Sequence, residues 1–353
     1  MAGTGRARAT TLARRLLRAG ASRPAVRRAL GTAARELDRA VRDAPFGEDV
    51  YGAGYYGDGR DPDDRGGLSG YERYDRDTSN ADVAAYLLWR HFGVHRVLDV
   101  GCATGFVVEA LRELGLDAKG VDVSRWAVQH PALGATGHIG YGDLLERLPF
   151  EDDSFDLVSA FETLEHLPPE SVPRALLELR RVTRSYVVAT IPSFGRNEHG
   201  PGGWYQQKVR EELLPRYWAR GEGYDGPVPF DDIARDATGA PLEGHLTMAS
   251  FRWWTERFAC AGFVRLGEVE RAIHPHLARF GLTKYWNLYV FALPSAAVPD
   301  GPVRDEAALA ERERLWKLDV RTADPEDEDR VREALTSPGG GPLTGVGEIP
   351  PDL

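Results

Sequence analysis

The sequence predicts an α/β fold, a doubly wound and mostly parallel sheet with helices on both faces. Residues 97–100 form an apolar run that ends in a turn containing Gly101 and Gly105. Apolar runs of this kind are typical of strands buried on both faces of a parallel sheet. Short apolar segments then alternate with amphipathic segments as far as residue 191. Because parallel strands need a crossover connection, this alternation predicts repeated strand–helix units.

The predicted elements follow that alternation in order. Strands are expected over 95–100, 118–123, 137–141, 155–161 and 186–191, and helices over 105–114, 124–130 and 168–182. Pro192 ends the fifth strand, because proline has no N–H to donate to a strand ladder. A tail helix is expected over 305–318, before a Pro- and Gly-rich end that we expect to be flexible.

Composition is typical of a globular enzyme of the cytoplasm. Of the 353 residues, 42% are hydrophobic and 28% are charged, which suits a packed core. Cys102 and Cys260 are the only cysteines, so a disulfide scaffold is not expected. No apolar run is long enough to cross a bilayer. The net charge of −10 argues against a general nucleic-acid binder.

The charge is unevenly distributed along the chain. The first 43 residues hold eleven arginines against three acidic residues. A basic amphipathic helix in this leader, residues 1–45, would allow peripheral contact with an anionic membrane. The alternative is a solvated, flexible leader, and both interpretations stay open.

The glycine turn predicts a nucleoside cofactor. Its sequence argues against a dinucleotide and against a nucleotide bound by a P-loop. A dinucleotide fingerprint needs a third glycine where this chain has Phe106, and no phosphate-binding P-loop motif occurs. Asp122 ends the second predicted strand about twenty residues after Gly101. At that spacing a carboxylate can accept hydrogen bonds from a ribose diol.

Four segments in order resemble class I S-adenosylmethionine (SAM)-dependent methyltransferases. They are the motif D-x-G-C-A-T-G at 99–105, Asp122 after the second strand, Gly142-Asp143-Leu144, and the stretch 148–158 of the pattern L-P-F…S-F-D-L-V. The resemblance implies SAM as cofactor and a Rossmann-like sheet. It also implies that Asp143 accepts from the adenine amino group while Leu144 offers its amide. The implied cofactor-binding residues are Asp99, Gly101, Ala103, Gly105, Asp122, Val123, Asp143, Leu144 and Phe161.

The same resemblance implies the remaining elements and the domain plan. A last helix over 250–262 and an antiparallel closing pair of strands over 263–271 and 285–293 are expected. The predicted divisions are a basic leader (1–45), a lid or helix segment (46–94), the methyltransferase domain (95–294) with a substrate-cap insertion (193–246), and a largely flexible tail (295–353). Tyr51, Tyr55, Tyr56, Tyr71 and Tyr74 make the lid segment aromatic.

Candidate catalytic residues follow the fourth predicted strand. If 162–166 form a helical turn, Glu162, Glu165 and His166 share one face, and His245 precedes the last helix. Carboxylate and imidazole side chains together are a plausible divalent-metal set. This E-x-x-E-H pattern with a distant histidine resembles the metal site of RNA 3′-terminal 2′-O-methyltransferases, and partly that of ubiquinone-pathway O-methyltransferases. Acid–base catalysis by His166, with His245 and Glu162, and a purely structural role are the alternatives.

The acceptor is predicted to be a small molecule, a sugar or another hydroxylated metabolite, methylated on oxygen. The insertion combines aromatic and polar side chains with mixed charge, and aromatic faces stack on sugar rings. The side chains in question are Asn197, His199, Trp204, Tyr205, Trp218 and Tyr224. Two alternatives stay open: an RNA 2′-O-methyltransferase with a metal at the E-x-x-E-H cluster, and a SAM-binding partner or sensor without catalysis.

Overall fold

We describe the fold from a computed structural model. It describes residues 51–52, 54–56, 74–200, 209–213, 217, 224–235, 241, 244–279 and 287–299. The basic leader, the tail helix expected over 305–318 and the flexible end lie outside this part of the chain. Among the described residues, no helix is both long enough and apolar enough to cross a membrane.

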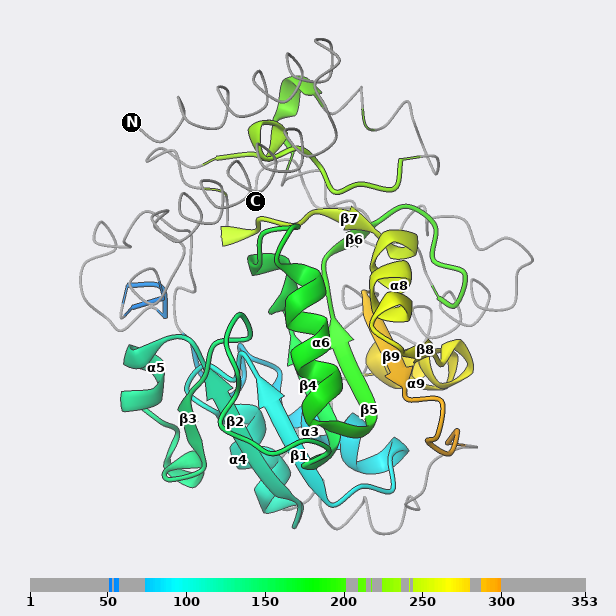
Figure 1. Ribbon diagram of the computed structural model, residues 1–353. Coiled ribbons are helices and arrows are strands. Elements are labelled where there is room, and N and C mark those ends of the chain that lie inside the picture. Colours follow the sequence, from blue (N-terminus) through cyan, green and yellow to red (C-terminus); the bar gives the residue numbers. More distant parts are fainter. Residues whose placement is uncertain are drawn as a thin grey trace, which may run out of the picture.

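A seven-stranded sheet forms the centre of the molecule, in the order β3-β2-β1-β4-β5-β9-β8 (Figure 1). Its first five strands are parallel, and β9 runs antiparallel to both β5 and β8. The bounds are β1 Arg96–Val100, β2 Asp117–Asp122, β3 Ile139–Tyr141, β4 Phe155–Phe161, β5 Thr183–Thr190, β8 Val264–Arg265 and β9 Leu288–Ala292. The predicted α/β fold with an antiparallel closing strand is confirmed.

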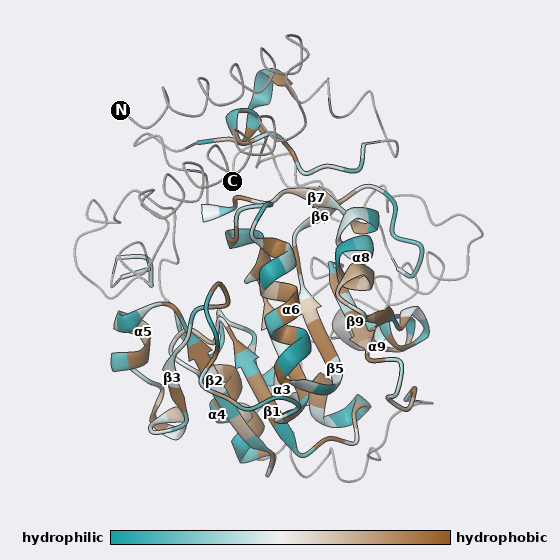
Figure 2. Ribbon diagram, viewed as in Figure 1, coloured by the Kyte–Doolittle hydropathy of each residue, from teal (hydrophilic) through white to brown (hydrophobic). Residues whose placement is uncertain are grey.

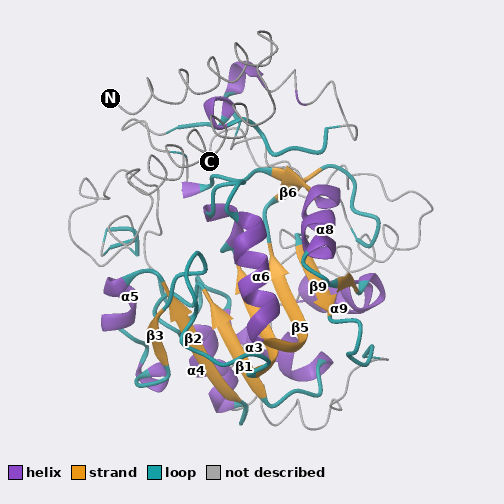
Figure 3. Cartoon of the chain, viewed as in Figure 1, coloured by secondary structure: helices purple, strands orange, loops and turns teal. Residues whose placement is uncertain are grey.

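Helices cover both faces of this sheet, as Figure 3 shows. One hydrophobic core joins α3, α4 and α9 to the sheet, and a second joins α6 and α8 to it. The helices are α3 Ala81–His91, α4 Phe106–Glu113, α5 Arg125–Gln129, α6 Val172–Val182, α8 Phe251–Cys260 and α9 Gly267–Arg279. Short 3-10 turns are η1 Leu133–Ala135, η2 Leu164–His166, η4 Glu211–Leu213 and η6 Phe230–Asp232.

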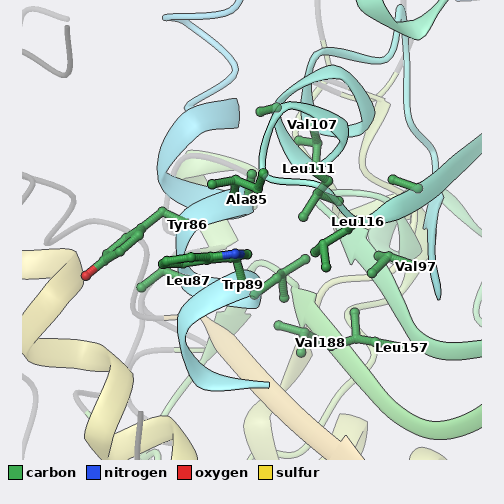
Figure 4. Packing of buried hydrophobic residues seen from close by; sticks show 14 of the residues in the cluster. Ala85, Tyr86, Leu87, Trp89, Val97, Val107, Leu111, Leu116, Leu157 and Val188 are labelled. Atoms are coloured by element: carbon green, nitrogen blue, oxygen red, sulfur yellow. The ribbon is translucent and has the colours of Figure 1, made fainter. Parts of the chain in front are cut away.

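Alternation along the strands divides the apolar residues between the two cores. Val97 belongs to the α3–α4 core and Leu98 to the α6–α8 core, because successive strand residues point to opposite faces. Figure 4 shows Tyr86, Leu87 and Trp89 of α3 in the first of these cores. The strand residues that face either core are mostly apolar, although β1 and β2 also carry charged residues such as Asp99 and Lys119, and the helices combine hydrophilic and hydrophobic residues (Figure 2). This is the burial pattern of a doubly wound sheet.

The structure corrects one predicted element and shifts others. Residues 267–271, predicted as strand, form the first turn of α9, and β8 is only two residues long. The Leu266 N–H bonds the Val290 carbonyl at 2.7 Å, and the Glu270 carboxylate then accepts from the Val290 N–H at 2.9 Å. A side chain thus replaces the strand along this part of β9. Helix α6 begins at Val172 instead of 168, after a turn in which Ser171 N–H bonds the Pro168 carbonyl.

The described part of the insertion has a small core of its own. Strands β6 (Ser193–Phe194) and β7 (Ala249–Ser250) pair in parallel where the insertion leaves and rejoins the domain, beyond the carboxyl end of β5 (Figure 1). The buried members of the core are Phe194, Val209, Tyr217, Val228, Ile233 and Met248. Trp204, Tyr205 and Trp218 lie outside the described residues. Tyr224 stacks on Phe194, so this aromatic ring helps to hold the insertion together.

Candidate active site

The turn after β1 has the positive φ angles that its glycines predict. The folded chain adds a second reason for glycine, which is close packing against residues from other segments. Gly101 has φ +72° and Gly105 has φ +88°. A Cβ on Gly101 would lie 2.4 Å from Thr163 Oγ1, and one on Gly105 would lie 2.8 Å from the Cβ of Ala135. Close packing within the protein therefore excludes side chains at both positions. Ala103 also has positive φ, +48°, although it is not glycine.

Asp122 is held against this turn by two backbone amides. Its carboxylate accepts from the Ala103 N–H and from the Ser124 N–H, both at 2.7 Å. Burial raises the pKa of Asp122, while these hydrogen bonds act to lower it. Each oxygen of an ionised carboxylate has two acceptor positions. The two amides therefore fix the orientation of the carboxylate and leave it capacity for a ligand.

Asp99 is a different kind of carboxylate, buried inside the sheet. It pairs with Ser159 across β1 and β4, and the Ser159 hydroxyl donates to its Oδ1 at 2.7 Å. Burial raises the pKa of Asp99 to about 7, and the serine hydroxyl only partly offsets that effect. Asp99 is 3% exposed and lies two residues before Gly101 of the turn.

The other predicted cofactor residues lie at the same edge of the sheet. Asp143 follows β3, and its Oδ1 accepts from the Leu145 N–H at 2.7 Å. Leu144 is buried, and Val123 and Phe161 are half-buried at the ends of β2 and β4. The carboxyl ends of parallel strands are where ligands bind in open α/β sheets.

An aromatic segment from before the domain covers this edge. The Ser124 hydroxyl donates to the Tyr51 carbonyl at 2.5 Å, and Tyr56 stacks on Trp126 with centroids 5.3 Å apart. Tyr56 and Ala103 share one hydrophobic cluster. Ser124 was missed as a site residue, although a serine before a helix is the usual N-cap signal; here its hydroxyl also caps α5 through Ala127.

Three of the four candidate catalytic residues come together. Glu165, His166 and His245 each offer a ligand atom, and these atoms lie within 4.8 Å of one another. His245 Nε2 is 4.0 Å from Glu165 Oε1, and the two imidazole rings meet edge to face at 5.1 Å. Glu165 is fully buried and His245 nearly so. We call these three residues the histidine cluster.

The backbone around η2 builds the histidine cluster from distant segments. The Glu165 carbonyl accepts from the N–H groups of Leu246 and Thr247, at 2.8 and 2.9 Å. Nδ1 of His166 lies 3.2 Å from the Gly244 carbonyl, to which it donates when that nitrogen is protonated. These bonds hold the end of the insertion against η2.

Glu162 is separate from the histidine cluster. Residues 164–166 form a 3-10 turn, and Glu162 has φ +49°, so 162–166 do not make the helical turn that the spacing suggested. Its Oε1 accepts instead from Asn287 Nδ2 at 2.7 Å. Asn287, just before β9, carries no motif in the sequence, and only the folded chain brings it to Glu162.

Tyr51 lies between the Asp122–Ser124 edge and the histidine cluster. Its ring contacts the His166 ring edge to face, with centroids 5.6 Å apart, while its carbonyl is bonded to Ser124. Burial, with the nearby charges of Asp122 and Glu165, raises the pKa of its phenol well above the ordinary value. The hydroxyl therefore remains protonated at neutral pH.

Comparisons with known proteins agree with this geometry. Residues 98–188 match a family model described as a methyltransferase domain. A ubiquinone biosynthesis O-methyltransferase from Ralstonia nicotianae is 40% identical over 90 residues, which are 24% of this chain and 38% of the relative. One from Bordetella avium is 34% identical over 156 residues, 42% of this chain and 62% of the relative. The chain spans between 38% and 60% of the length of the first three curated relatives.

Solved structures are similar at lower identity. The CcbJ methyltransferase from Streptomyces caelestis has a TM-score of 0.43 at 15% identity, covering 71% of this chain and 98% of its own. The PH0226 protein from Pyrococcus horikoshii has a TM-score of 0.37 at 17% identity, covering 62% and 90%. The strand order and the family match define a class I SAM-dependent methyltransferase domain, and this chain contains one over residues 98–188.

Proposed function

We propose that the protein transfers the methyl group of SAM to a hydroxyl oxygen of a small acceptor, a sugar or another hydroxylated metabolite. The observation that carries this proposal is the position of Tyr51, which touches the Asp122–Ser124 edge on one side and His166 of the histidine cluster on the other. A cofactor held at the first and an acceptor held at the second would meet at this junction.

SAM is assigned to the edge of β1, β2 and β3. Asp122 is oriented to accept from the ribose diol, and Asp143 is placed to accept from the adenine amino group beside the Leu144 amide. The turn residues and the ends of β2 and β4 would line the rest of the pocket. These residues are Asp99, Gly101, Ala103, Gly105, Val123 and Phe161, with Asp99 just before the turn.

The histidine cluster supplies a base for the acceptor. In the transfer, the acceptor oxygen attacks the methyl carbon, the C–S bond breaks with its electron pair on sulfur, and the hydroxyl proton leaves to a base. With Nδ1 of His166 donating to the Gly244 carbonyl, Nε2 is the nitrogen that can take this proton. His245 is placed to do the same from the other side of the cluster. General-base assistance typically contributes 10²–10⁴-fold.

The histidine cluster also fits a divalent metal ion. Two imidazoles and one carboxylate are a common ligand set for catalytic zinc and for other first-row metals, and open positions then remain for an acceptor. The metal-binding atom of His166 would be Nε2, because its Nδ1–H would donate to the Gly244 carbonyl. When bound, such an ion lowers the pKa of a coordinated hydroxyl. Glu162 would enter this set only by leaving Asn287.

The relatives support oxygen as the acceptor atom. The relatives from Ralstonia nicotianae and Bordetella avium are both named O-methyltransferases. Small acceptors fit the described insertion better than RNA does, since Arg210 pairs with Glu212 and Arg235 lies over the Phe230 ring. An RNA acceptor is favoured by one observation, the resemblance of the histidine cluster to the metal site of RNA 2′-O-methyltransferases.

Calorimetric titration with SAM and its demethylated product, S-adenosylhomocysteine (SAH), tests the cofactor. We expect both to bind, and mass spectrometry of metabolite and RNA mixtures incubated with SAM should then show a methyl gain in a small hydroxylated compound. Binding without any methylated product would favour the sensor. Failure of both ligands to bind would reject the proposal.

A thermal-unfolding titration with Zn²⁺ and Mn²⁺ tests the metal. At a hundredfold excess over Kd, a bound ion should stabilise the wild type by about 2.7 kcal/mol. His245→Ala should lose that gain. His95→Ala is the control, because His95 is exposed and precedes β1 at the opposite edge of the sheet. Equal gains in both variants would exclude the histidine cluster as the metal site.

A further inference from the structure

Buried polar side chains attach the first residues of the insertion to β8 and α9. Asn197 Oδ1 accepts from Arg265 Nη2 at 2.9 Å and from the His199 N–H at 3.1 Å. A Cβ on Gly267, the first residue of α9, would overlap the His199 ring. We call residues 195–200 the docking segment. Its contacts join the start of the insertion to the two elements that pack on β9.

A buried histidine lies directly against the docking segment. His274, on α9, is 1% exposed, and neither of its ring nitrogens has a hydrogen-bond partner among the described residues. A Cβ on Gly200 would be 2.5 Å from His274 Nε2 and 3.1 Å from Asn197 Nδ2, which is also buried and unpartnered there. Polar groups that are buried without a partner are unfavourable. Moving the docking segment away would give water access to Nε2.

The surroundings of His274 oppose a proton on its ring. Burial lowers the pKa of His274 from 6.5 to about 3, and the positive charge of Arg265 acts in the same direction. Glu270, one turn earlier on α9, is already bonded to Arg265 and to the Val290 N–H. No described carboxylate bonds the His274 ring. The docked position therefore keeps this histidine neutral.

The other titratable and charged groups around α9 give no compensation. His199 Nδ1 lies 3.2 Å from Arg271 Nη1, and burial lowers the pKa of His199 too. The charged side chains of the docking segment itself, Arg196 and Glu198, are exposed. The buried charged or titratable side chains of α3, which packs against α9, are Arg90 and His91. The buried groups of this region are thus mostly basic.

Gly195 gives the docking segment a point about which it can turn. Its φ is +81°, and nothing lies within 4 Å of an added Cβ. Strand β6 ends one residue earlier, at Phe194, and pairs with β7. Residues 196–200 can therefore leave α9 while this pair of strands stays intact.

We propose that protonation of His274 releases the docking segment from α9, so that acid loosens the start of the insertion. A protonated imidazole has two N–H donors, and the docked position offers neither of them a described acceptor. The inference goes beyond the proposed function, because it concerns how the insertion opens. The insertion starts beyond the carboxyl end of β5, so its release would open the side on which we propose that the acceptor binds.

Proton linkage gives the expected size of the effect. The pKa of His274 is about 3 in the docked state and near its ordinary value of 6.5 once the segment is released. Docking is therefore at full strength above about pH 7 and weakens as pH falls through 6.5. The ratio of released to docked protein should rise about tenfold by pH 5.5 and about a hundredfold by pH 4.5.

Hydrogen exchange of the whole chain, measured by mass spectrometry, tests the inference. After correction for the intrinsic pH dependence of exchange, the protection of residues 195–200 should fall about tenfold between pH 8 and pH 5.5. Residues 183–190 of β5 should keep their protection, which excludes global unfolding. His274→Gln has no titratable ring, so its docking segment should be equally protected at both pH values. His95→Gln is the matched control, since His95 is exposed, and it should behave as the wild type.

Two further variants make the assignment specific. His274→Leu should behave as His274→Gln does, and it replaces that variant if glutamine prevents folding. His199→Gln should retain most of the fall in protection, because the His199 ring is only half-buried. Equal protection at both pH values in the wild type would overturn the inference, and so would a fall that persists in a folded His274 variant. Neither SAM nor an acceptor is present, so the result does not depend on the proposed function.

Discussion

The proposed site has two halves. The cofactor half is the turn after β1 with Asp122, where we propose that SAM binds, and the acceptor half consists of Glu162 and the histidine cluster after β4, where we propose that the acceptor binds. The two halves differ in how far apart in sequence their contacts are. On the cofactor half, Asp122 reaches Ala103 over 19 residues. On the acceptor half, His166 reaches Gly244 over 78 residues, and Asn287 reaches Glu162 over 125. The cofactor half is therefore made by one strand–turn–helix unit and its neighbour. The acceptor half exists only when the insertion and β9 have docked.

This difference has an energetic side. The cofactor half depends on backbone shape, with positive φ at Gly101, Ala103 and Gly105. The acceptor half depends on contacts between buried polar side chains of distant elements. Breaking such a contact costs much stability, because the remaining polar group stays buried without its partner. We expect the largest destabilisation from substitutions that break buried polar contacts between distant elements, such as those that hold β9.

The largest expected effect is that of Glu270→Gln. Glu270 is fully buried, pairs with Arg265 at 2.8 Å and accepts from the Val290 N–H of β9. Removing one charge of a buried pair typically costs about 3–5 kcal/mol, so urea unfolding should show a loss of that order. Glu268→Gln, which breaks an exposed pair with Arg271 on the same helix, should leave the unfolding midpoint unchanged. Equal midpoints for both variants would show that β9 is held by other contacts.

The next effect concerns the turn itself. Gly101→Ala should destabilise by about 2–4 kcal/mol, because it combines a positive φ with a collision against Thr163. Gly115→Ala isolates the first of these causes, since Gly115 has φ +83° and nothing lies within 4 Å of an added Cβ. It should cost about 1 kcal/mol. A Gly101 variant no less stable than the Gly115 variant would mean that Thr163 moves aside freely.

The smallest effect depends on pH. Because burial raises the pKa of Asp99 to about 7 from 3.8, the folded state binds a proton that the unfolded state releases. This contribution is complete below about pH 4 and is lost as pH rises through 7. Asp99→Asn should remove the dependence, so its stability relative to wild type should improve by on the order of 2 kcal/mol between pH 5 and pH 8. Urea unfolding at both pH values measures this, and parallel curves would contradict it.

The same contrast explains what could be predicted from sequence. The strand over 155–161 was predicted to the residue, and the turn at 99–105 was found, because both are encoded by adjacent residues. The strand predicted over 263–271 was wrong beyond Arg265. Leu266 and Val269 within it, together with Ile273 beyond it, have a spacing that fits a helix as well, and in the folded chain the Glu270 side chain, not a strand, bonds this part of β9.

The histidine cluster could be predicted from the sequence only in part. Glu165 and His166 are adjacent, and His245 was found as a histidine just before the last helix, so residue types were enough to nominate them. Glu162 was grouped with them on a helical spacing that its positive φ does not allow. Asn287 has no signal in the sequence, since its partner is 125 residues away.

The place of β9 in the sheet also sets when the domain can be completed. It lies between β5 and β8, yet it is the last strand of the described chain. On the ribosome, β5 therefore keeps an open edge until residues 288–292 have been made, while the parallel half of the sheet is already available to fold. A shortened chain that ends before residue 288 would expose that edge to pairing with other molecules. Expression of such fragments should yield aggregates, and the full sheet should form only after synthesis has passed β9.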